Sequence, residues 1–383
     1  RYLQLAAEQN PELRAKFLNY QASLKMVPQV GALPDPELAF GWFARPVETR
    51  VGAQEARISV TQMFPWFGTL ANRQNVAMLK SKAAYEEARE FRNRLFYRVK
   101  TKWYELYEID QTIRILDENI NILESFESIA LRQYEVDKAS QIDVLRIQLD
   151  KEDLINRLEL LQDDKKVANQ EFSELLNGLN SEPLVPDSLS PDSLMLAKQE
   201  LEKRVLNQNA GLMKLDYRSE AAVGEIDLAR KQGRPDFGLG IDYIFTDERQ
   251  QLLDDNGKDA VLARASITIP LYRNKYKAMN EQRKLELNSI EQQEASLRNQ
   301  LLTSMETGYR DYRDARRKLE LYENLQIQRT RQALNIMVSA YATDTDVEFE
   351  EILRLQRRLL GYQLNLQQAV VQQSTAVAFL EYL

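Results

Sequence analysis

A long stretch without glycine or proline places the strongest constraint on how this chain can fold. From Thr69 to about Arg132 neither residue occurs. Within this stretch, apolar residues recur in alternating steps of four and three residues, at Ile109, Ile113, Leu116, Ile120 and Leu123. This periodicity predicts an amphipathic helix. About 60 helical residues extend roughly 90 Å. A compact globular domain has no use for such a helix, so a coiled coil or a helical barrel is expected.

The predicted elements occur twice, in the same order, along the 383 residues. Each half contains a helix, two strands, a very long helix, a turn and a last helix. The two copies are each as long as half of the chain, which indicates a duplicated half-protein and not a short repeat. The first repeat is expected over 1–180 and the second over 193–383, joined by a linker at 181–192. The first-half elements are predicted at about 1–30, 37–45, 56–63, 69–132 and 141–178. The second-half elements are predicted at about 193–231, 236–245, 261–269, 274–340 and from the following turn to Leu383.

The turn after each very long helix is also repeated. Residues 133–148 and 341–356 share one layout, in which Tyr134 corresponds to Tyr341 and Asp143 to Glu351. Each turn is followed by the start of another helix, so the two turns are expected to act as equivalent tips of the molecule.

Each predicted strand has one apolar and one polar face, because side chains alternate across a strand. This alternation is typical of outer-membrane barrels, with apolar residues toward lipid and polar residues toward a water-filled lumen. Four strands are too few to close such a barrel, so several chains must share it. Two soluble hairpins packed under helices remain the alternative. The residues expected to face lipid are Phe40, Trp42, Ile58, Val60, Leu239, Ile241, Tyr243 and Ile267.

The composition excludes several kinds of chemistry. The chain has neither Cys nor His, which removes thiol catalysis, histidine bases and nearly all zinc or copper sites built from those ligands. A net charge of −7 argues against general binding of nucleic acid. No apolar run is long enough for a transmembrane helix. No cofactor, metal site or enzyme activity is therefore expected, and the eight Met residues are interpreted as core filling.

The duplicated plan and its tips resemble the TolC family of outer-membrane efflux proteins over essentially the whole chain. Residues 62–70, Gln-Met-Phe-Pro-Trp-Phe-Gly-Thr-Leu, are similar to the strand-to-helix junction of the CusC/CzcC-like branch, which serves heavy-metal pumps. Residues 132–148 resemble that branch's first periplasmic tip. Where the family usually has Gly three residues after the tip Tyr, this chain has Asp137 and Asp344.

The resemblance implies a homotrimer in the bacterial outer membrane that extends into the periplasm. Three chains would share a twelve-stranded β-barrel in outer-membrane lipid, and their helices would form a periplasmic α-barrel. The implied partners are an inner-membrane pump and a periplasmic adaptor protein, and the implied function is passive export of small substrates. The junction residues favour metal cations, while drug efflux and type I protein secretion on the same fold stay open. A soluble periplasmic coiled-coil scaffold is the structural alternative.

The tips carry the expected site residues. Threefold symmetry would turn their acids into rings at the periplasmic entrance, where carboxylates attract cations. The resemblance places the family's aperture acid near Glu351 and its second aperture carboxylate at Arg354, so one ring is expected. The alternative is that these acids are helix N-terminal charges on a solvated face. The expected aperture residues are Glu351, Glu350, Glu348, Asp346, Arg354 and Asp143. The residues expected to contact the adaptor are Val136, Asp137, Lys138, Ala139, Thr343, Asp344 and Thr345, where ordinary turn chemistry is the alternative.

Overall fold

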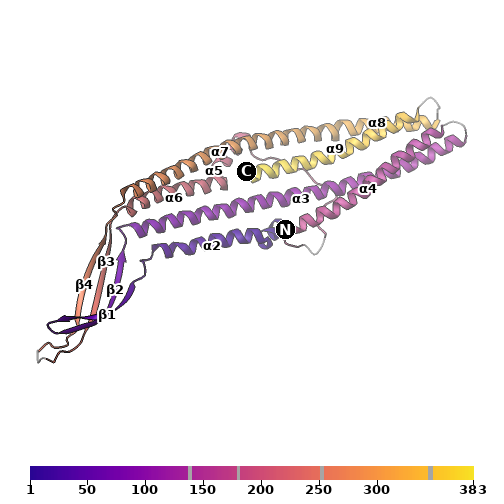
Figure 1. Ribbon diagram of the computed structural model, residues 1–383. Helices are drawn as coiled ribbons and strands as arrows, with labels where there is room; N and C mark the ends of the chain where they lie inside the picture. The colour runs from indigo at the N-terminus through magenta and orange to yellow at the C-terminus, as the bar shows by residue number, and fades with distance from the viewer. Residues whose placement is uncertain (137–139, 179–181, 251–253, 344–347) are drawn as a thin grey trace. The chain divides into compact units, whose positions relative to one another are not determined.

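The computed structural model describes residues 1–136, 140–178, 182–250, 254–343 and 348–383. Over these residues the chain is mainly helical and carries one small antiparallel sheet (Figure 1), which confirms the predicted fold class. The strands are β1 (Glu37–Thr49), β2 (Gly52–Phe64), β3 (Asp236–Thr246) and β4 (Ala260–Thr268). The helices are α1 (Tyr2–Gln9), α2 (Pro11–Gly31), α3 (Thr69–Glu135), α4 (Gln141–Leu175), α5 (Lys198–Gln208), α6 (Ala210–Gln232), α7 (Arg273–Leu321), the π-helix η1 (Tyr322–Gln326), α8 (Ile327–Thr343) and α9 (Phe349–Tyr382).

The longest predicted helix is confirmed, since α3 runs without a break for 67 residues. Three other predicted helices are interrupted. The helix expected over 1–30 breaks at Asn10, whose side chain accepts a hydrogen bond from the Leu13 N–H at 3.0 Å and so starts α2. The helix expected over 193–231 begins only at Lys198 and breaks at Asn209. The one expected over 274–340 contains the π-turn of η1.

The four strands form one sheet in the order β1-β2-β3-β4, with all neighbours antiparallel. The register places Phe40 opposite Ile58, and Ile58 opposite Tyr243. Apolar residues therefore share one face across adjacent strands. Within the described part of the chain, β1 and β4 each have a neighbour on one side only, so the sheet ends in two open edges.

The contacts divide the chain into two compact units, and each is built from both halves of the sequence. Unit 1 consists of Arg1–Ala15, Arg89–Asn209 and Arg298–Leu383, and unit 2 consists of Lys16–Ala88 and Ala210–Leu297. Unit 2 contains the sheet and the helix ends that lead into it (Figure 1). Unit 1 contains the adjoining ends of α3 and α4 and of α8 and α9. No helix among the described residues is both long and apolar enough to cross a bilayer.

A hydrophobic cluster holds α3, α4, α8 and α9 together at the tip end of unit 1. Its largest fully buried members are Ile147, Ile352 and Leu353. The rings of Phe126 and Phe349 meet edge to face, with centroids 6.2 Å apart. This packing fixes the start of α9 and so determines where the neighbouring polar side chains point.

Candidate functional site

The apolar face of the sheet is uncovered. Phe40 and Trp42 are each 68% exposed, and Ile241 is 61% exposed. Soluble monomers rarely leave a contiguous apolar surface of this kind open to water. The structure also differs from the hairpin alternative, because β2 pairs with β3 and no helix covers this face in the described residues. All eight residues predicted to face lipid are exposed: Phe40, Trp42, Ile58, Val60, Leu239, Ile241, Tyr243 and Ile267.

The opposite face of the sheet is polar and charged. Ser59 and Asp242 lie opposite each other on β2 and β3 and are only 3% and 1% exposed. The Arg264 guanidinium lies 3.5 Å from the Asp242 carboxylate and donates a hydrogen bond to the Thr61 hydroxyl at 3.0 Å. The two faces of the sheet thus differ in the way that the strand pattern predicts.

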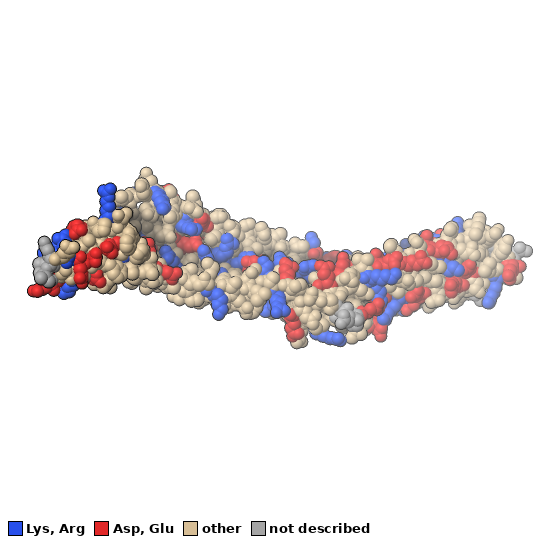
Figure 2. Space-filling model, turned by 60° about the horizontal axis from the view of Figure 1, so that its bottom comes forward, with Lys and Arg blue, Asp and Glu red and all other residues tan. Residues whose placement is uncertain are grey.

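At the tip end of unit 1, Glu350 connects two helices. Its carboxylate lies 3.1 Å from Arg146 on α4 and 3.7 Å from Arg357 on α9. Arg357 also forms an ion pair with Asp150 on α4 at 2.8 Å. These contacts join the starts of α4 and α9 across the surface. Figure 2 shows acidic and basic side chains interspersed at this end of the molecule.

Glu351, the expected aperture acid, has a different partner. It forms an ion pair with Arg354 one turn later on the same helix. The side chains of Glu351 and Arg354 are 40% and 60% exposed, so solvent screens the pair. The acid and the arginine expected near the aperture are therefore partners within one chain, and each partly offsets the charge of the other.

Asp143 caps the start of α4. It accepts a hydrogen bond from the backbone N–H of Ser140 at 3.3 Å, while the Ser140 hydroxyl accepts one from Ile142 N–H at 3.2 Å. This reciprocal arrangement is a capping box. Arg146 lies 3.8 Å from the same carboxylate. The local geometry of Asp143 agrees with the alternative that it is a helix N-terminal charge, and Glu348 is the exposed N-cap residue of α9.

Most of the residues expected at the two turns lie outside the described residues. This applies to Asp137, Lys138, Ala139, Asp344, Thr345 and Asp346. Thr343 is the last residue of α8, and Val136 follows α3 with 60% of its surface exposed. Contact of these positions with an adaptor stays a prediction.

Two polar links at the tip end were not predicted from the sequence. Gln356 on α9 donates a hydrogen bond to Asn119 on α3 at 2.6 Å, and both side chains are buried. Lys151 on α4 donates to Glu127 on α3 at 2.7 Å, which lowers the pKa of that carboxyl. Asn119 lies beside the apolar stripe of α3. A polar residue at that position was the sequence signal that could have indicated a buried hydrogen bond there. Among the described residues, no acidic cluster could hold a metal ion.

No protein-family model matches the chain, and no curated protein sequence matches it. Solved structures do match. The outer membrane protein VceC from Vibrio cholerae has a TM-score of 0.80 at 16% identity, covering 100% of this chain and 94% of VceC. The outer-membrane channel OprN has a TM-score of 0.79 at 17% identity, covering 100% and 88%.

CusC, studied for its transmembrane channel formation, has a TM-score of 0.75 at 16% identity, covering 99% of this chain and 90% of CusC. Its score is no higher than those of VceC and OprN, so the comparison does not single out the metal branch. At these identities the matches establish the fold. The chain has the TolC-like channel fold of these outer-membrane proteins.

Proposed function

We propose that this chain is one protomer of a homotrimeric outer-membrane channel that passively exports small substrates. It would receive them from an inner-membrane pump and a periplasmic adaptor. The observation that carries this proposal is the sheet: its apolar face is exposed, its other face is polar, and both of its edges are open. A lipid environment favours such a face, whereas water does not.

The open edges support a trimer. In lipid, backbone N–H and C=O groups at a sheet edge have no water to bond, so each edge must pair with another strand. Pairing β4 of one chain with β1 of the next satisfies both edges in a closed ring. Three chains of four strands give twelve strands, an even number within the range of outer-membrane barrels.

The tips would then form the periplasmic entrance. The ion pairs of Glu350 and Arg357 hold α4 beside α9, which keeps the ends of the helices close together. We place the narrowest ring at Glu351, with Arg354 beside it, and adaptor contacts at 136–139 and 343–345. The channel itself would perform no catalysis.

Metal cations are the proposed cargo, and this rests on the likeness of residues 62–70 to the junction of the metal branch. Drug export and protein secretion are the competing outcomes. A deletion strain complemented with this chain and its pump should regain resistance to metal salts. Regained resistance to organic drugs alone would contradict the metal proposal and leave the channel proposal standing.

Conductance tests the channel proposal directly. The detergent-purified protein should form long-lived pores in planar bilayers, and a Phe40→Arg variant should insert much less often. A protein that leaves membranes without detergent and forms no pores would contradict the proposal and favour a periplasmic scaffold.

A further inference from the structure

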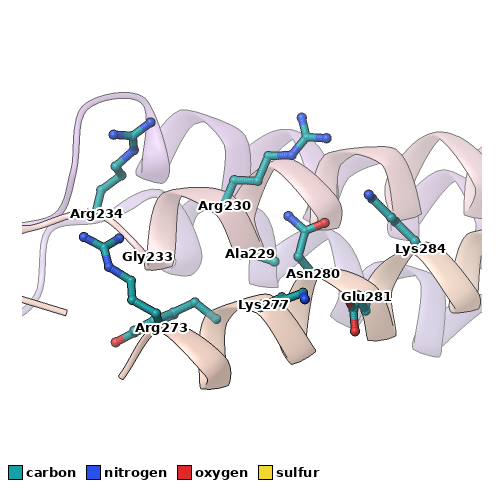
Figure 3. Close-up of a pocket in the computed structure, with 10 residues that line it drawn as sticks. Ala229, Arg230, Gly233, Arg234, Arg273, Lys277, Asn280, Glu281 and Lys284 are labelled. Atoms are coloured by element: carbon teal, nitrogen blue, oxygen red, sulfur yellow. The ribbon is translucent and has the colours of Figure 1, made fainter. Parts of the chain in front are cut away.

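A basic cavity lies in unit 2 where α6 ends and α7 begins. It has a volume of about 630 Å³. Its lining includes Arg230 and Arg234 on the α6 side and Arg273, Lys277 and Lys284 on α7, whose side chains extend in different directions in Figure 3. Glu281 is the single acid among its described lining residues. Five cations against one carboxylate make this cavity strongly positive in a chain whose net charge is −7.

No acidic side chain balances these cations in the described part of the chain. Among the described residues, none of the five forms an ion pair, whereas Arg283, also on α7, pairs with Glu225 and Glu286. The side-chain oxygen of Asn280, which also lines the cavity, is buried without a hydrogen-bond partner. That oxygen is a hydrogen-bond acceptor and would not bind an anion, so an anion site here rests on the five cations.

The position of the cations on α7 is unfavourable for the helix alone. Arg273 and Lys277 lie in its first turns, and the first turn contains no acidic residue. The N-terminus of a helix carries a partial positive charge, which repels cations and attracts anions. Arg230, at the C-terminus of α6, is explained by the dipole of that helix, but Arg273 and Lys277 are not. An anion in the cavity would remove this repulsion.

The helix ends that line the cavity connect directly to strands of the sheet. α6 is followed directly by β3, and β4 leads directly into α7. Leu271 and Tyr272, in that second connection, are 74% and 79% exposed. Arg234 lies over the ring of Trp66, 5.9 Å from its centroid. Aromatic rings beside cations, here the half-buried Trp66 and the exposed Tyr272, are the arrangement found at the level of lipid headgroups.

We propose that this cavity binds the phosphate of an anionic phospholipid in the periplasmic leaflet, with the acyl chains against the apolar face of the sheet. The inference rests on the proposed function, because it needs the sheet to lie in a membrane. Arg273 and Lys277 would contact the phosphate, and Arg230, Arg234 and Lys284 would add to the positive potential around it.

The test uses the full-length protein and the double variant R273Q/K277Q. Because these cations oppose the helix dipole, their removal should not destabilise the fold. The matched control is R329Q/R331Q, which removes the same charge from exposed positions on α8. Native mass spectrometry in neutral detergent would measure binding of dioleoylphosphatidylglycerol, dioleoylphosphatidylcholine and inorganic phosphate.

The wild-type protein and the control should retain phosphatidylglycerol in preference to phosphatidylcholine. The R273Q/K277Q variant should bind phosphatidylglycerol on the order of 30-fold more weakly, from about 1 kcal/mol for each cation removed. Equal binding by this variant and the wild type, or an equal loss in the control, would overturn the proposal. If inorganic phosphate binds as tightly as phosphatidylglycerol, the cavity is a site for free phosphate and the proposal of a lipid ligand is wrong.

Conductance separates this inference from the proposed function. Pores formed in phosphatidylcholine bilayers by a protein that shows no preference for phosphatidylglycerol would refute the lipid site and leave the channel intact. Absence of pores in every bilayer would refute the channel, whereas the binding measurement in detergent would still report on the cavity.

Discussion

Glu350 and Glu351 are neighbours in the sequence but have different roles in the structure. Adjacent helical positions point about 100° apart, so Glu350 reaches Arg146 on α4, while Glu351 pairs with Arg354 on its own helix. The repeat in the sequence equates Glu351 with Asp143, yet Asp143 caps a helix. The sequence did not predict the partners of Asp143 and Glu350, because residues such as Arg146 and Glu350 are brought together only by packing.

The link between Lys151 and Glu127 gives a prediction about pH. Hydrogen bonds from Lys151 and then Gln148 lower the pKa of Glu127 below its ordinary value of 4.5. A carboxyl with a lowered pKa stabilises the fold above its ordinary value, and this stability is lost as pH falls through the lowered pKa. Lys151→Gln should therefore cost about 1–2 kcal/mol at pH 7, and the difference from wild type should shrink as the pH falls below 4.5.

Chemical denaturation in detergent at pH 7 and at acidic pH measures this effect. The control is Lys166→Gln, because Lys166 and its partner Asp163 are 77% and 73% exposed and such pairs contribute little. A pH-independent loss in Lys151→Gln would show that packing of the lysine stem, and not the charge of Glu127, provides the stability.

At the level of elements, strands were easier to predict than helix interruptions. Period-two alternation reports directly which side chains share a face, so the faces of β3 followed from its sequence. Pro11 was an available signal for the break after α1, since proline favours the first position of a helix. The break at Asn209 has no neighbouring proline to mark it. The π-turn of η1 has no signal either, because it inserts one residue into a helix without a characteristic composition.

The two faces of the sheet predict opposite effects of the same substitution. Phe40→Arg or Ile241→Arg would place a charge on the exposed apolar face and should reduce membrane assembly, at a cost of about 2–4 kcal/mol near the bilayer midplane. Ser266→Arg, on the polar face opposite Gly238, should be far milder. The amount of protein in the outer-membrane fraction measures this. Equal assembly of all three variants would contradict the assignment of the faces.

At the level of the whole molecule, the edges of the sheet are the strongest sign of association between chains. The sequence predicted that four strands could not close a barrel. It could not predict the strand order, because four helices of the described chain, α3 to α6, separate β2 from β3, which meet only through long-range pairing. That pairing makes one sheet out of two hairpins and leaves β1 and β4 as its edges.

Cysteine cross-linking tests the pairing of the sheet edges. The sequence contains no Cys, so only the introduced cysteines can form disulfides. Ala39→Cys on β1, combined with Arg264→Cys or Ser266→Cys on β4, should give covalent dimers and trimers on a denaturing gel. Within one chain these positions are separated by three strand spacings, at least about 14 Å, too far for a disulfide. Ala39→Cys with Ser59→Cys, which are opposite each other in one chain, is the monomeric control. Failure of every edge pair to link chains would argue against a shared barrel.

Channel block by a trivalent cation tests the balance of charge between Glu351 and Arg354 at the tip. In a trimer, Arg354 beside each Glu351 would reduce, but not cancel, the negative potential of the ring at Glu351. A trivalent cation added from the periplasmic side of a planar bilayer should block the wild-type channel by binding to these carboxylates. Arg354→Gln should strengthen the block, on the order of tenfold in blocking concentration or ~1.4 kcal/mol. Glu351→Gln should weaken it, and Glu348→Gln should change it little because Glu348 lies before the helix. If the Glu351 and Arg354 variants shift the block in the same direction, these residues act through the packing of α9, and the charge that controls entry lies elsewhere.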